Sequence, residues 1–182
     1  MLSLPNLLTA MRIVMTPVVA WAIAVSDWRL AGALFVVAAV SDALDGWLAR
    51  KLNATSSLGE QLDPIADKAL INAAMTGCAL AGLLPVWLAG LTMARDAMIL
   101  LGALLTRSFR LGQSLRPLRI GKVSTAGQMT LIALALGSAA GITIPAPAMT
   151  ALIAATALVT LASGGAYLRH WLIHHPARKA SE

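Results

Sequence analysis

The sequence has little of several residue types that common protein classes require. Only 12% of its 182 residues are charged and only 4% are aromatic, whereas about a quarter of the residues in an ordinary soluble domain are charged. Its one cysteine, Cys78, has no partner within the chain for a disulfide or for a cysteine-based metal or redox motif. These shortages argue against a soluble globular domain and against a fold held together by disulfides.

Apolar residues, by contrast, make up 58% of the chain, and the mean hydropathy is +0.77. Leu4, Pro5, Asn6 and Thr9 predict a short interfacial helix at the N-terminus, because proline favours early helical positions. Six apolar segments follow, each near the roughly 20 residues that span a bilayer: about 7–26, 30–50, 66–84, 86–107, 123–142 and 148–171. We therefore expect an all-α integral membrane protein, with six transmembrane helices and a short N-terminal interfacial helix, forming a single domain over residues 1–182.

Basic residues are concentrated in alternate connections between these segments. They are Arg50, Lys51 and Lys68 around the second, Arg107, Arg110, Arg116, Arg119 and Lys122 in the fourth, and Arg169, Arg178 and Lys179 after the last. This positive-inside pattern predicts that both termini are cytoplasmic. The N-terminus lacks a basic leader and an Arg-rich transit segment, so we expect a bacterial cytoplasmic membrane. The net charge of +6 follows the loops, not a soluble face that would bind nucleic acid.

Four aspartates lie beside and inside this apolar sequence: Asp42, Asp45, Asp63 and Asp67. A carboxylate at membrane depth costs at least about 2.5–3.5 kcal/mol, so four of them need a compensating cation. Spacings of three and four residues place each pair on one face of a helix. Carboxylate oxygens suit one or two Mg²⁺ or Mn²⁺ ions, and two such ions stabilise the attacking and leaving oxygens of a displacement at phosphorus.

Small and basic residues around the aspartates fit a phosphate-bearing nucleotide. Gly46, Ala49 and Gly59 would let it approach the helix backbone closely, and Arg50 could pair with a phosphate. Simpler readings stay open for single residues. Asp63 could cap a helix before Pro64, and the glycines could serve helix packing.

The segment from Asp42 to Asp67 resembles the signature of the CDP-alcohol phosphatidyltransferase family, D-x2-D-G-x2-A-R-x8-G-x3-D-x3-D, at every fixed position. The resemblance implies a six-helix membrane core that is commonly a homodimer, with the motif on the second and third helices facing the cytoplasm. It implies that the four aspartates hold two divalent cations on the pyrophosphate of CDP-diacylglycerol, and that Asp67 is also the general base. The same resemblance assigns donor contacts to Asn6, Gly46, Ala49, Arg50, Ser56 and Gly59.

The signature does not identify the acceptor alcohol. The opening residues and the stretch from Gly121 to Gln128 resemble two branches of the family, which use phosphatidylglycerol and glycerol 3-phosphate as acceptors. Arg95 and Asp96 resemble the first branch, so we favour cardiolipin formation with release of CMP over phosphatidylglycerophosphate synthesis. Both acceptors carry phosphate, and Arg95, Arg107, Arg110, Arg119 and Lys122 are candidate contacts. Arg95, in an apolar segment, predicts a buried ion pair or a substrate contact.

Two other interpretations carry less weight. Intramembrane carboxylates also line the pathways of ion-coupled transporters, but these would place charges in both halves of the chain, and no acidic residue lies between Asp96 and Glu182. His170, His174 and His175 have a spacing that could suit a metal, yet a cytoplasmic flank is the simpler explanation.

Overall fold

The computed structural model describes the backbone of residues 4–52, 59–108 and 119–174 and the side chains of residues 11–41, 68–102 and 120–169. This part of the chain is all helical. It forms six helices: α1 (Leu4–Ala24), α2 (Trp28–Leu52), α3 (Gly59–Leu80), α4 (Val86–Ser108), α5 (Arg119–Ala139) and α6 (Ala146–His174).

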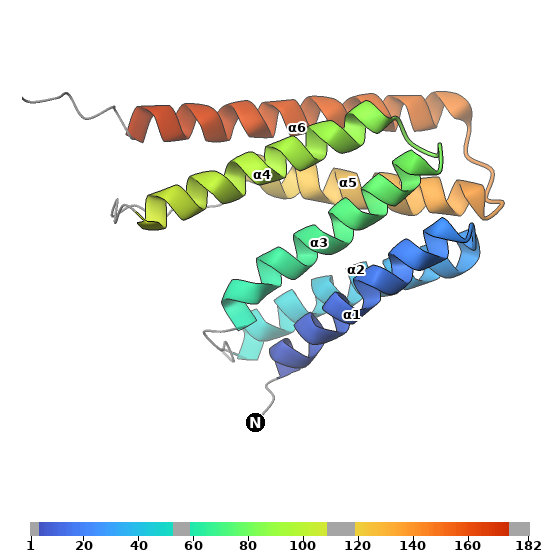
Figure 1. Cartoon of the computed structure of the whole chain (residues 1–182), viewed down its shortest axis with the longest axis horizontal. Helices are drawn as coiled ribbons and strands as arrows, with labels where there is room; N and C mark the ends of the chain where they lie inside the picture. Colours follow the sequence, from blue (N-terminus) through green and yellow to red (C-terminus); the bar gives the residue numbers. More distant parts are fainter. Residues whose placement is uncertain (1–3, 53–58, 109–118, 175–182) are drawn as a thin grey trace, which may run out of the picture.

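The helices form a bundle in which α3 joins two groups (Figure 1). The hairpin of α1 and α2 lies on one side of the bundle, and α3 packs on α1 there. From this side α2 also contacts α5, which belongs to the other group. On the other side α6 packs on both α4 and α5, while α3 contacts α4 and α5. α3 therefore contacts helices of both groups.

Three short connections lie together at one end of the bundle (Figure 1), and each follows the same backbone pattern. At the end of α3, Leu83 N donates to Cys78 O at 2.9 Å and Gly82 N donates to Ala79 O at 3.1 Å, which is a Schellman turn. The ends of α1 and α5 repeat it, with Ser26 (φ 61°) and Gly141 (φ 105°) in the left-handed position that Gly82 (φ 78°) occupies after α3.

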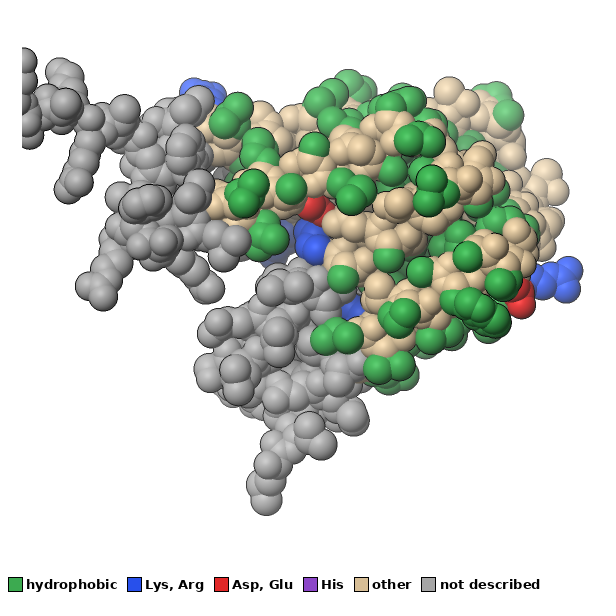
Figure 2. Space-filling model, viewed as in Figure 1, with side chains coloured by type: hydrophobic (Ala, Val, Ile, Leu, Met, Phe, Trp, Pro, Cys, Tyr) green, Lys and Arg blue, Asp and Glu red, His purple; other side chains and the backbone are tan. Residues whose placement is uncertain are grey.

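The outer surface of the bundle is strongly apolar. Among the described side chains, large hydrophobic residues such as Leu80, Trp87 and Leu158 are more than half exposed, and Figure 2 shows such side chains across the visible face. A soluble monomer rarely exposes contiguous apolar patches beyond a few hundred Å². Within α6, the stretch Ala146–Arg169 is long and apolar enough to cross a membrane, and it is the one such helix among the described residues.

The helix boundaries correct one expectation from the sequence and refine another. The first helix is continuous from Leu4 to Ala24, so the described residues contain no separate interfacial helix before it. Pro5 stands in the first turn, where its missing N–H costs no hydrogen bond, so nothing interrupts the helix there. The third helix begins at Gly59, seven residues before the apolar segment expected from 66, and it includes Asp63 and Asp67, as the spacing of the motif predicts.

Candidate functional site

The aspartate motif occupies the facing ends of two helices. Asp42 and Asp45 belong to the last turns of α2, and Asp63 and Asp67 to the first turns of α3. Their side chains lie outside the described residues. The helical backbone nevertheless confirms that residues three and four apart share a face within each pair.

The residues expected to contact the nucleotide lie on the same helix ends. Gly46, Ala49 and Arg50 are in α2, Gly59 is the first residue of α3, and Asn6 is in the first turn of α1. Figure 1 shows the start of α1, the end of α2 and the start of α3 next to one another. Ser56 lies outside the described residues, and so do the side chains of the other five. The fold thus brings the first turn of α1, which contains Asn6, to the helix ends that carry the motif.

The donor set suits the hard cations that the motif implies. Four carboxylates on two helix ends that meet at one end of the bundle offer oxygen ligands, which Mg²⁺ and Mn²⁺ prefer. Both helices that carry the motif pack on the same two neighbours, because α2 and α3 each contact α1 and α5.

Next to the motif, α4 contributes a buried ion pair. Arg95 is 6% exposed, and its Nη1 donates to Asp96 Oδ1 at 2.7 Å. Its Nε and Nη2 both donate to Ser163 Oγ, at 3.1 and 2.6 Å, and Nη2 also reaches Gly121 O at 3.5 Å. The guanidinium lies 5.9 Å from the centre of the Tyr167 ring. The structure confirms the expected ion pair, while the contact of Arg95 with an acceptor phosphate stays a prediction.

Asp96 is also bound from the opposite side by α3. Lys68 Nζ donates to Asp96 Oδ1 at 2.8 Å and to Thr125 Oγ1 at 3.3 Å. Asn72 Nδ2 donates to Asp96 Oδ2 at 3.2 Å. The Asp96 carboxylate therefore binds the ammonium of Lys68 and the amide of Asn72 from α3, and the guanidinium of Arg95 from its own helix α4. Through Lys68 and Arg95 it is connected to α5 and α6. We call these seven residues the Asp96 network: Lys68, Asn72, Arg95, Asp96, Gly121, Thr125 and Ser163.

Sequence reasoning missed most of this network. The sequence explains Lys68 only as one of the basic residues of the positive-inside pattern, and it gives no individual role to Asn72, Thr125 or Ser163. One local signal was present, since Lys68 directly follows Asp67 and stands four residues before Asn72, on the same face of a helix. Their common partner Asp96 is 28 residues from Lys68 along the chain, which a local pattern does not show.

The basic residues expected to bind the acceptor are only partly described. Arg119 is the first residue of α5, and Lys122, one turn later, is exposed. Arg95 Nη2 reaches the carbonyl of Gly121, which lies between Arg119 and Lys122 in the chain. Arg110 lies outside the described residues, and so does the side chain of Arg107. A Cβ on Gly121 would stand 3.1 Å from Arg95 Nη2, so a side chain there would press on the guanidinium.

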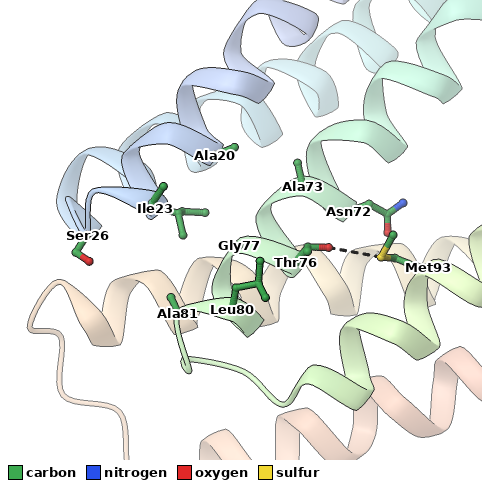
Figure 3. A pocket seen from close by; sticks show the side chains of 11 residues that line it. Ala20, Ile23, Ser26, Asn72, Ala73, Thr76, Gly77, Leu80, Ala81 and Met93 are labelled. Atoms are coloured by element: carbon green, nitrogen blue, oxygen red, sulfur yellow. Dashed lines mark hydrogen bonds between the residues drawn. The ribbon is translucent and has the colours of Figure 1, made fainter.

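A cavity of about 640 Å³ lies between α1, α3 and α4, away from the motif (Figure 3). Its lining runs from Asn72 along α3 to Leu80 and Ala81, and it includes Ile23 from α1 and Met93 from α4. Most of this lining is apolar. The cavity extends toward the end of the bundle with the short connections, so it is not the predicted nucleotide site.

Comparison with known proteins adds to this geometry. Residues 2–167 match the family model for CDP-alcohol phosphatidyltransferase. The chain is 37% identical to a chloroplastic CDP-diacylglycerol–glycerol-3-phosphate 3-phosphatidyltransferase 1 from Oryza sativa subsp. japonica, over 74% of this chain and 46% of that protein. It is 30% identical to a "probable cardiolipin synthase (CMP-forming)" from Drosophila melanogaster, over 92% of this chain and 57% of that protein, and 34% identical to a cardiolipin synthase (CMP-forming) from Rattus norvegicus, over 75% and 50%. The chain spans about half the length of the curated relatives it matches.

Proposed function

We propose that this chain, which belongs to the CDP-alcohol phosphatidyltransferase family, is a membrane enzyme that transfers a phosphatidyl group from CDP-diacylglycerol to an alcohol and releases CMP. The observation that carries the proposal is the complete aspartate motif at the adjoining ends of α2 and α3. Because the family model covers residues 2–167, the motif lies within a match that extends over nearly the whole chain.

The chemistry follows from the carboxylates and their surroundings. Two Mg²⁺ or Mn²⁺ ions, when bound, would neutralise the pyrophosphate of the donor. Asp42, Asp45, Asp63 and Asp67 would hold them, with Asn6, Gly46, Ala49, Arg50, Ser56 and Gly59 positioning the cytidine nucleotide. Asp67 would accept the proton of the acceptor hydroxyl, whose oxygen forms a bond to the phosphorus that bears diacylglycerol. The bond from that phosphorus to the CMP oxygen breaks, and CMP leaves.

We further propose a single membrane domain with six transmembrane helices, both termini and the site on the cytoplasmic face of a bacterial inner membrane, and assembly as a homodimer. The exposed apolar surface and the span Ala146–Arg169 support a membrane location. The positive-inside pattern supports the orientation. The dimer rests on the family resemblance.

For the acceptor we propose phosphatidylglycerol, giving cardiolipin, with glycerol 3-phosphate as the second candidate. Relatives named for each reaction are similar to this chain, and the Arg95–Asp96 pair favours the first. Arg110, Arg119 and Lys122 would contact the acceptor phosphate, together with Arg95. Since Arg95 is occupied by protein partners, it would have to exchange one of them, whereas the exposed Lys122 can reach a phosphate directly.

The test is a reconstituted assay. Purified protein is incubated with CDP-diacylglycerol and Mg²⁺, and each acceptor is offered separately. Products and CMP are then measured by mass spectrometry. We expect Mg²⁺-dependent CMP release with cardiolipin as the product. Product with glycerol 3-phosphate alone would select the second acceptor, and no CMP release with either acceptor would refute the enzyme assignment.

A further inference from the structure

Asp96 has more partners than an ion pair within one helix requires. Its side chain is 7% exposed and accepts hydrogen bonds from Lys68, Asn72 and Arg95. It is the one acidic residue between Asp67 and Glu182. A buried carboxylate is tolerated when it is paired and hydrogen-bonded. This one compensates two cations, so removing its charge would leave Lys68 and Arg95 facing each other.

On α3, the contacts to Asp96 fix the rotation of the helix. Lys68 and Asn72 stand four residues apart on one face, and each binds a different oxygen of the same carboxylate, at 2.8 and 3.2 Å. Two contacts one turn apart hold a helix against both rotation and sliding, which one contact does not.

The contacts of Lys68 and Asn72 with Asp96 lie next to the proposed metal ligands. Lys68 follows Asp67 directly, and Asp63 is one turn earlier on the same helix. Mg²⁺ demands near-ideal octahedral geometry with metal–oxygen distances of about 2.0–2.1 Å. A small rotation of α3 would therefore move Asp63 and Asp67 out of position relative to Asp42 and Asp45 on α2.

The other side of the carboxylate is anchored to the far half of the bundle. Arg95, bound to Asp96 Oδ1, donates twice to Ser163 on α6 and once to Gly121 on α5. Lys68 adds a contact to Thr125 on α5. Asp96 is thus held from α5 and α6 while it holds α3.

We propose that Asp96 is a positioning residue for the reaction: through Lys68 and Asn72 it sets the rotation of α3 that lets Asp63 and Asp67 share cations with Asp42 and Asp45. This inference rests on the proposed two-metal function. It assigns to Asp96 a role that is separate from acceptor recognition, because the carboxylate is buried and is occupied by protein donors.

The test is the variant Asp96→Asn, which keeps the shape of the side chain but removes its charge. Mn²⁺ binding to the purified protein in detergent with CDP present is measured by the loss of the free Mn²⁺ signal in electron paramagnetic resonance. Replacing residues that orient metal ligands typically weakens metal binding about 10–100-fold, and we expect a loss of at least about tenfold. An Asp96→Asn protein that binds Mn²⁺ like the unmodified protein would overturn the proposal.

Thr160→Val is the matched control, because it removes a buried hydrogen bond between α5 and α6, the 3.1 Å contact of Thr160 Oγ1 with Ser124 Oγ, and neither residue belongs to the Asp96 network. We expect a lower Tm, with the Mn²⁺ affinity changed by less than about twofold, well below the roughly tenfold effect expected for Asp96→Asn. An equal loss of Mn²⁺ affinity in Thr160→Val would show that general loosening of the bundle explains the effect, and would also overturn the proposal. Two further variants serve if Asp96→Asn does not fold. Lys68→Met and Asn72→Leu each remove one of the two contacts between α3 and Asp96, and each should weaken Mn²⁺ binding. Unchanged Mn²⁺ binding in both variants would refute the inference.

Asp67→Asn separates this inference from the proposed function. It should weaken Mn²⁺ binding as well, because it removes a proposed ligand. If Asp67→Asn binds Mn²⁺ normally, the metal site itself is wrong. If Asp67→Asn loses binding and Asp96→Asn keeps it, the metal site stands and only the role of Asp96 fails.

Discussion

The two ends of the bundle differ in how their helices stop. At one end α1, α3 and α5 each finish in a Schellman turn, and the connections that follow carry few charges, with Asp27 and Arg29 beside the first. At the other end α2 and α3 carry the four aspartates, and α5 begins with Arg119 and the exposed Lys122.

The difference separates structural from functional demands. At the first end, backbone carbonyls in the last turns of α1, α3 and α5 accept hydrogen bonds within the Schellman turns. The second end carries the four aspartates of the motif and the basic residues Arg119 and Lys122, for which we propose divalent cations and phosphates as partners. The Asp96 network joins α3 to α4, α5 and α6.

The largest effect should come from Asp67→Asn at the aspartate end. Loss of a general base typically costs about 10²–10⁴-fold, and Asp67 is also a proposed metal ligand, so we expect kcat to fall at least 100-fold in the CMP-release assay. Asp27→Asn at the opposite end is the matched control. Asp27 Oδ1 accepts from Leu30 N at 3.1 Å as the cap of α2, a role asparagine fills equally well. Comparable losses in both variants would erase the functional distinction between the ends.

Next is Arg95→Met, which tests the stability contributed by the network. Removing one partner of a buried ion pair costs about 3–5 kcal/mol, but interhelical hydrogen bonds within membranes average only about 0.6 kcal/mol. Because Lys68 would still neutralise Asp96, we expect a loss of about 2 kcal/mol, between these limits, seen as a lower Tm in detergent. Arg29→Met, next to the first short connection, should leave Tm nearly unchanged, and an equal drop would contradict a special role for Arg95.

A smaller effect is expected for Gly82→Ala at the end with the short turns. A Cβ there would meet nothing within 4 Å, so the cost comes from the backbone alone. At φ 78° an L-residue is disfavoured by roughly 1–2 kcal/mol. We expect a modest decrease in Tm with unchanged acceptor KM. A rise in KM would mean that this end also shapes the site.

The smallest effect should come from Ser26→Gly, the reverse change in the equivalent turn of α1. Serine at φ 61° already bears the left-handed cost, which glycine would relieve. Glycine loses more conformational entropy on folding, by roughly 0.5–1 kcal/mol, so the two terms nearly cancel. Tm should stay the same or rise slightly. A clear decrease would indicate that the Ser26 side chain contributes to the turn.

Much of the fold could be read from the sequence because it depends on local composition. Apolar segments predicted most of the helices within a few residues. The apolar segment from 66 is shorter than α3, because the polar residues from Gly59 do not resemble a membrane span, but the spacing of Asp63 and Asp67 correctly predicted that they are helical. The prediction of a separate interfacial helix was wrong, since α1 is continuous from Leu4 and Pro5 lies in its first turn without interrupting it.

The aspartate motif and its family were determined by the sequence alone, because the four aspartates lie on neighbouring segments at spacings that a helix places on one face. The partners of Asp96 were decided only by the tertiary structure. Arg95 and Ser163 are 68 residues apart, and Lys68 and Asp96 are 28 apart. Which polar side chains meet in the interior depends on how α3, α4, α5 and α6 cross and rotate, and no local spacing encodes that packing.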